Sequence, residues 1–134
     1  MIEAGKMMSE LVLVNPAFTE EWVGFKDEWN EEGELPYYLV LGDYARHVKS
    51  LHESGEEQLL FEIFKVVEKL HLEGNHYVRE AMTIGLLEGI QNITATSKGG
   101  SLAYEKYLLP ETKYWWDKLN SFWNNGELIE DDRT

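Results

Sequence analysis

Apolar residues recur every three or four positions through most of the chain, which is the spacing of one face of an α-helix. The pattern is clearest over residues 59–70, where the apolar positions are Leu59, Leu60, Ile63, Phe64, Val67 and Leu70. Alternation of apolar and polar residues, the mark of a half-buried strand, does not extend over a useful length anywhere. The sequence therefore predicts an all-α protein.

Turn-forming residues divide this pattern into six or seven helical segments. The predicted helices span residues 7–14, 20–32, 36–51, 59–70, 76–92, 102–109 and 111–124. We expect the Thr19 hydroxyl to cap the second helix and Gly74 to end the fourth in the left-handed conformation. Short connections favour antiparallel neighbours. Residues 1–134 are therefore predicted to form a single-domain bundle of about six to seven antiparallel helices, with 127–134 as a frayed tail.

A row of small residues runs along the fifth predicted helix. Ala81, Gly85 and Gly89 lie four residues apart, beside an apolar row that contains Met82 and Leu86. Glycine inside a helix costs about 1 kcal/mol relative to alanine. Two such glycines on one side predict that another helix approaches there unusually closely.

Composition narrows the possible functions. The 134 residues carry 25 acidic and 12 basic side chains, a formal net charge of −13, and no cysteine. Without cysteine the chain has neither a disulfide framework nor a thiolate zinc site. A chain with a pI near 4.6 repels nucleic acid. The 43% apolar content and five tryptophans indicate a folded domain rather than a disordered acidic segment.

Targeting and membrane signals are not evident. The apolar run near the N-terminus, Leu11–Val14, is shorter than the core of a signal peptide. No window approaches the roughly 20 apolar residues that span a bilayer. We expect a cytoplasmic protein that does not enter a membrane.

Candidate chemistry is sparse. The sequence has no nucleophile motif and no glycine-rich phosphate loop, so we expect no enzymatic activity, no catalytic residue and no cofactor. His47 and His52 are poorly spaced to share a metal on one helix. His71 and His76 flank a turn and could converge with Glu73 on a metal ion, but surface or capping positions are the favoured explanation for them.

The aromatic residues are interpreted mainly as core. Their spacing on the predicted helices places most of these side chains inside: Trp22, Trp29, Trp115, Trp116, Phe122 and Trp123. Adjacent tryptophans point about 100° apart on a helix. One of Trp115 and Trp116 is therefore expected to line a groove or an interface.

Negative charge is concentrated in the first quarter of the chain. Residues 1–34 contain nine acidic and two basic side chains, a net charge of −7. Two tyrosines follow this segment, and aromatic side chains favour the centres of interfaces. We predict a surface that binds a basic protein partner, formed by Asp27, Glu28, Glu31, Glu32, Glu34, Tyr37 and Tyr38. The alternative is a solvated face that provides only solubility.

Two segments carry a family resemblance: FEIFKVVEKLHLEGNHYVREAMTIGLLEGIQN at 61–92 and LLPETKYWWDKLNSFW at 108–123. Together with the acidic helical N-terminal half, they resemble a largely uncharacterised bacterial family of small, acidic, all-helical proteins. Some members are thought to be immunity proteins for polymorphic or contact-dependent toxins. The similarity is close over these two segments and loose over the first half. Leu109 stands where the family pattern has glycine before the proline.

The resemblance implies an immunity protein that binds and neutralises a cognate toxin by occlusion. Such toxins are often nucleases, whose basic grooves an acidic surface could fill. Two alternatives stay open on the sequence. One is a generic cytoplasmic interaction module or a homodimer formed through the tryptophan-rich last helix. The other is a small metal- or ligand-binding bundle that uses the histidines.

Overall fold

Helices make up the regular structure of residues 1–29 and 35–133, the part of the chain that the computed structural model describes. The α-helices of this part are α1 (Ala4–Val14), α2 (Thr19–Glu28), α3 (Tyr37–Glu53), α4 (Glu57–Glu73), α5 (His76–Glu80), α6 (Glu88–Thr94) and α7 (Pro110–Asn125). A π segment (Ala81–Leu87) joins α5 to α6, and 3₁₀ turns occupy Pro16–Phe18 and Ser101–Tyr107. Extended pairing in this part is limited to one isolated bridge between Ile2 and Gly74. The all-α prediction is confirmed.

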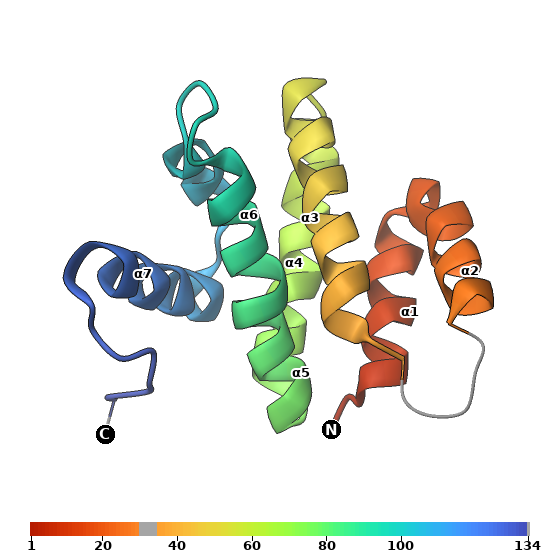
Figure 1. Cartoon of the computed structure of the whole chain (residues 1–134), viewed down its shortest axis with the longest axis horizontal. Helices are drawn as coiled ribbons and strands as arrows, with labels where there is room; N and C mark the ends of the chain where they lie inside the picture. Colours follow the sequence, from red (N-terminus) through yellow and green to blue (C-terminus); the bar gives the residue numbers. More distant parts are fainter. Residues whose placement is uncertain (30–34, 134) are drawn as a thin grey trace.

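The helices alternate in direction until the last one. In Figure 1, α1, α2, α3, α4 and the continuous column from α5 to α6 run alternately up and down, as the short connections predict. α7 lies across this bundle on the side opposite to α1 and α2. None of the helices in the described residues is long and apolar enough to cross a membrane.

The core lies between α1, α3, α4 and the α5–α6 column. Met7, Leu11, Val48, Phe64 and Leu86 are among its fully buried side chains. A polar bond ties two of the helices together, because the hydroxyl of Tyr44 in α3 donates to the carbonyl of Leu11 in α1 over 2.9 Å. The ring of Phe18 meets the Tyr44 ring edge-on at 4.9 Å, which fixes the turn before α2 against α3.

The small-residue row lies where the sequence predicts a close approach. A Cβ atom on Gly85 would lie 2.8 Å from Cδ1 of Leu41 and 3.2 Å from Cδ1 of Tyr38. A Cβ on Gly89 would lie 3.3 Å from Cβ of Ala45. All three neighbours belong to α3, so the predicted close contact is confirmed and its partner is α3.

The π segment is a feature that the sequence did not reveal. Residues 76–94 form one uninterrupted helix, in agreement with the predicted helix over 76–92, but Ala81–Leu87 has the wider π geometry. Such segments are rare, and they occur frequently at functional sites. This helix buries Met82, Leu86 and Ile90, which belong to its predicted apolar row.

Two predictions about helix ends, at Thr19 and at Gly74, are wrong. Thr19 does not cap α2: the 3₁₀ turn runs directly into the helix, and Thr19 already has helical dihedrals (φ −56°, ψ −46°). Gly74 is not left-handed, since its φ is −70° and its ψ 154°. Glycine is required there for space, because a Cβ would lie 2.4 Å from the carbonyl oxygen of Leu70 and 2.5 Å from Cγ1 of Val78.

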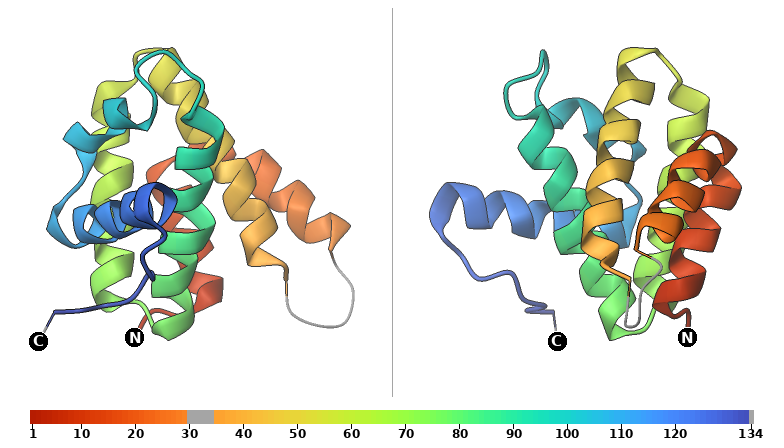
Figure 2. Two further views of the ribbon diagram at one scale, coloured as in Figure 1. Left: turned by 60° about the vertical axis from the view of Figure 1, so that its left-hand side comes forward. Right: turned by 45° about the vertical axis from the view of Figure 1, so that its right-hand side comes forward.

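The core prediction fails for three aromatic residues. Trp116 is fully buried, but Phe122 and Trp123 are 39% and 53% exposed, and Trp29 is 42% exposed. Figure 2 shows the reason for α7, whose C-terminal end projects beyond the helices on which its first turns pack. Spacing identifies the apolar side of a helix, but here no neighbouring element covers its last turn.

The described residues after α7, in the segment predicted as a frayed tail, contain no helix. The chain turns at Gly126, whose φ of +70° is the left-handed conformation that glycine adopts without strain. The described residues beyond it run back along α7, as Figure 2 shows in dark blue.

Candidate protein-binding surface

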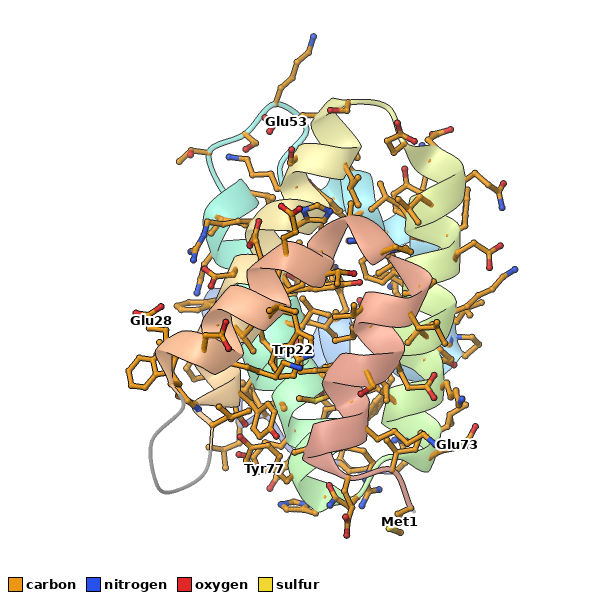
Figure 3. The ribbon with its side chains drawn as sticks, turned by 90° about the vertical axis from the view of Figure 1, so that its right-hand side faces the viewer. Met1, Trp22, Glu28, Glu53, Glu73 and Tyr77 are labelled. Carbon is orange, nitrogen blue, oxygen red and sulfur yellow. The ribbon has the colours of Figure 1, made fainter. Side chains whose placement is uncertain are left out.

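α2 ends in a ladder of three aromatic rings. Trp22 stacks on Phe25 with ring centres 6.0 Å apart, and Phe25 lies 6.3 Å from Trp29. Trp22 and Phe25 are buried, while Trp29 is the exposed end of the ladder. Figure 3 shows Trp22 pointing into the molecule and Glu28 pointing outward from the end of the same helix.

Two of the predicted binding residues occupy this end of α2. Asp27 and Glu28 are exposed in its last turn. The C-terminus of a helix carries partial negative charge, so carboxylates there are unfavourable by a few tenths of a kcal/mol. Their position is therefore not explained by the stability of the helix. Three further predicted residues, Glu31, Glu32 and Glu34, lie outside the described residues.

The other two predicted residues belong to a tyrosine cluster. The ring of Tyr77, from α5, meets Tyr37 at 6.2 Å and Tyr38 at 6.0 Å, edge-on in both cases. We call Tyr37, Tyr38 and Tyr77 the tyrosine cluster. Tyr38 packs over Gly85 and yet remains 36% exposed. The cluster thus joins the start of α3 to the start of the α5–α6 column.

The electrostatics of the cluster keep Tyr38 protonated. Burial, the negative charge of Glu80, the neighbouring Tyr77 and hydrogen bonding to Glu80 together raise the pKa of Tyr38 to about 12. Glu80 also pairs with Nε2 of His76 at 3.3 Å. At neutral pH the cluster therefore presents a phenol beside a carboxylate.

An open hollow of about 500 Å³ adjoins the tyrosine cluster. It is lined by Glu3, Ala4, Gly5, Leu35, Tyr37, Asn75 and Tyr77. The start of α1 borders this hollow because the backbone of Ile2 forms hydrogen bonds with the residues before and after Gly74. Ile2 N–H donates to the Glu73 carbonyl, and Asn75 N–H donates to the Ile2 carbonyl, each over 2.9 Å.

Sequence reasoning missed Tyr77 and Glu80. Both lie about forty positions after Tyr37 and Tyr38 in the chain, and only the packing of α3 on the α5–α6 column brings them together. One local signal was available. Tyr77 lies beside the apolar row that begins at Val78, and a large aromatic residue off such a row suggests a surface role.

The histidines do not converge on a metal ion. His71 is buried, and its ring nitrogens lie 3.0 Å from the Thr112 hydroxyl and 3.1 Å from the Thr83 hydroxyl. His76 is exposed. The part of the chain that the structure describes contains no group of three His, Asp or Glu side chains with metal-binding geometry. His71 is better explained as a structural link between helices.

Trp115 fulfils the prediction that one of the adjacent tryptophans lines a groove. It borders a hollow of about 520 Å³ together with Thr83, Ile84 and Ile129. A second hollow of similar volume lies at the other end of α7 and is lined by Leu102, Asn120 and Trp123 among others.

Comparison with known sequences identifies one family. A family model described as a domain of unknown function, DUF7674, matches residues 8–124. The chain belongs to the DUF7674 family. No curated protein and no solved structure matches it. The DUF7674 domain runs from within α1 to the last turn of α7, so the end of α2 and the tyrosine cluster are both part of it.

Proposed function

We propose that this DUF7674 protein binds a basic protein partner through the α2–α3 surface, defined as Asp27, Glu28 and Trp29 at the end of α2 and Tyr37 and Tyr38 at the start of α3. One observation carries the proposal. Two exposed carboxylates stand at a helix end that disfavours them, next to a tryptophan that closes a buried ladder yet faces solvent. Neither the two carboxylates nor the exposed tryptophan ring adds to the stability of α2, so binding to a partner is the better explanation of their position.

The α2–α3 surface has the chemistry that a basic partner requires. Carboxylates accelerate the approach of a positively charged protein and orient it. Aromatic side chains supply the large contact area that typically dominates binding energy. The ladder behind Trp29 and the ring contacts of Tyr38 hold these two side chains in place, so little side-chain freedom is lost on binding.

The partner that we propose is a cognate bacterial toxin. The resemblance of residues 61–92 and 108–123 to proteins thought to confer immunity supports it, as does the acidity of the chain. In this proposal the protein neutralises the toxin by occupying a basic groove, which in a nuclease would otherwise hold phosphates. The protein itself then performs no catalysis.

A charge reversal tests the proposal. Glu28→Lys should slow association with the protein encoded beside this gene and flatten the salt dependence of the association rate, because steering charges act on the association rate. Glu53→Lys is a matched control, since Glu53 is also the exposed last residue of a helix. Trp29→Ala should instead raise the dissociation rate.

The outcome that contradicts the α2–α3 surface is equal behaviour of the two charge reversals. If neither Glu28→Lys nor Trp29→Ala changes association or dissociation while the Glu53→Lys control also binds normally, the partner uses another face. Failure of the neighbouring protein to bind the unaltered chain would contradict the toxin partner itself.

A homodimer is the second candidate function, and the exposed end of α7 favours it. Phe122 and Trp123 pack edge-on to each other at 5.3 Å and face solvent, close to the hollow that Leu102 lines. A dimer through this face predicts a mass that doubles with concentration and a monomeric Trp123→Ser variant. A mass that stays monomeric at every concentration contradicts it.

A further inference from the structure

The C-terminal segment is held against α7 by polar contacts. The hydroxyl of Tyr114 donates to Oδ1 of Asp132 over 2.7 Å, and Lys118 pairs with the same carboxylate. Figures 1 and 2 show the segment turning back beneath α7. This arrangement brings Arg133 to the first turns of α7.

The guanidinium of Arg133 contacts Glu111, Tyr114 and Trp115 of α7, which we call the seat. It also donates to Asp131 of its own segment, from Nε over 3.0 Å and from Nη2 over 2.9 Å. Nη1 and Nη2 donate to the two oxygens of Glu111 over 2.8 and 2.7 Å, which is the paired geometry that a carboxylate offers only to arginine. Cζ lies 3.7 Å from the centre of the Tyr114 ring and 6.0 Å from that of Trp115. A carboxylate together with an aromatic face recognises both the charge and the flat shape of the group.

Contacts of α7 with α4 and within α7 position most of the seat. The carboxylate of Glu68, in α4, accepts the backbone N–H of Glu111 over 3.0 Å and that of Thr112 over 2.8 Å, which anchors the start of α7. Nε1 of Trp115 donates to Oε1 of Glu111 over 3.2 Å. The Tyr114 and Trp115 rings meet edge-on at 5.1 Å. Glu111 and Trp115 are therefore oriented by contacts within the bundle, whereas the Tyr114 hydroxyl is bonded to Asp132 of the segment.

The covering segment is loosely attached by comparison. Its described residues form no helix or strand, and Leu128 is 73% exposed. It leaves beneath it the hollow of about 520 Å³ that Trp115, Ile84 and Ile129 border. Ile129 packs partly buried against the core, and two ion pairs, Lys118–Asp132 and Arg133–Glu111, join the segment to α7. These ion pairs weaken with salt.

We propose that Glu111, Tyr114 and Trp115 form a binding site for an arginine side chain of a partner protein, and that Arg133 occupies this site in the free protein. Release of the segment exposes the carboxylate and the aromatic faces together. A chain with a net charge of −13 attracts partners whose surfaces are rich in basic residues, and arginine is the one that fits this seat. The site does not depend on the α2–α3 surface.

The test is a titration of the full chain with N-acetyl-arginine amide. Binding is monitored through the indole N–H signal of Trp115 in NMR spectra. The unaltered protein should respond at least tenfold more weakly than Arg133→Ala, because the tethered Arg133 competes at a high effective concentration. Arg133→Ala should show a saturable shift. N-acetyl-lysine amide should produce a much weaker one, because an ammonium group cannot form the paired contact.

Two further variants make the test specific. Arg133→Ala combined with Glu111→Gln should lose the response to the arginine probe, because the paired carboxylate is gone. Arg46→Ala is the matched control: it frees the exposed carboxylate of Asp43 from an arginine on α3, and it should leave the Trp115 response as weak as in the unaltered protein. Arg133→Gln, measured in parallel, should respond as Arg133→Ala does.

The proposal is overturned if both Arg133 variants keep the folded spectrum and show no saturable shift. It is also overturned if the lysine probe is equivalent, or if Glu111→Gln makes no difference. Loss of the folded spectrum in both Arg133 variants would equally contradict it, because the segment would then be part of the fold rather than a removable cover.

Discussion

The imidazole of His71 connects three helical elements at one point. It lies in α4, and its two nitrogens reach Thr83 in the π segment and Thr112 in α7. The Thr112 hydroxyl also donates to Glu68 over 2.8 Å, so the chain of polar contacts ends on a carboxylate. Burial lowers the pKa of His71 to about 4, and the nearby charges of Glu68 and Glu111 offset only part of that effect. The folded protein therefore holds this ring neutral.

A pH dependence of stability follows for this residue. The pKa of His71 is about 4 in the folded state and near 6.5 when unfolded, so its stabilisation is complete above pH 6.5 and is lost as the pH falls toward 4. Between pH 7 and pH 5 the free energy of unfolding should drop by about 2 kcal/mol through this group. Urea denaturation at the two pH values measures it.

Substitution separates His71 from the other titrating groups. His71→Gln should be less stable at pH 7 but should lose much less stability on going to pH 5. His76→Gln removes an exposed imidazole and should keep the full pH dependence of the unaltered protein. An unchanged pH dependence in His71→Gln would mean that other groups cause it.

At the scale of elements, the contact between α3 and the α5–α6 column positions much of the candidate surface. Gly85 and Gly89 let the column approach α3, and Tyr38 lies over Gly85 as a result. The same approach carries Tyr77 to Tyr37 and Tyr38. Gly85 thus serves the tyrosine cluster as well as the core.

Two glycine substitutions should have opposite effects. Gly85→Leu should reduce the free energy of unfolding by about 1–3 kcal/mol, because the new side chain has no room beside Leu41. Gly42→Ala, within α3, should raise it by about 0.5–1 kcal/mol, since a Cβ there meets nothing within 4 Å and alanine favours the helix. Thermal denaturation of the two variants measures both changes in the free energy of unfolding. A stable Gly85→Leu variant would contradict the close contact.

Glu28 at the end of α2 should lower the stability of the helix while it serves the binding that we propose. Glu28→Lys should raise the free energy of unfolding by about 0.3–1 kcal/mol at low ionic strength, because lysine complements a helix C-terminus that glutamate opposes. The gain should shrink in concentrated salt, where such interactions are screened. Equal stability of the unaltered protein and the variant at low salt would remove the argument that this carboxylate is locally unfavourable.

At the scale of the whole molecule, the end of α2 and the Arg133 seat lie on opposite sides. Figure 1 places α2 at one edge of the bundle and α7 at the other. A partner bound at the end of α2 would therefore leave the Arg133 seat free for another contact. The acidic character of the chain as a whole serves both surfaces, since a net charge of −13 favours approach by basic proteins from any direction.

The sequence by itself determined the helices. The periodicity of apolar residues placed the helices over 36–51, 59–70, 76–92 and 111–124 close to the observed ones, because this spacing reflects which side of a helix is apolar. The helix predicted over 20–32 begins as expected but ends at Glu28, and residues 30–32 lie outside the described residues. The sequence also indicated the close approach at Gly85 and Gly89, since glycine inside a helix needs a compensating contact. These are local properties, and they can be read from neighbouring positions in the chain.

Only the tertiary structure decided what covers each helix. Trp116 and Trp123 follow the same helical spacing, yet the first is buried and the second exposed, because α7 extends past the elements that pack on it. The need for glycine at position 74, the contact of Tyr77 with Tyr38 and the seating of Arg133 on Glu111 all depend on groups brought together by packing or by the return of the chain. Apolar spacing along one helix carries no information about distant partners, so these features arise only once the helices are assembled.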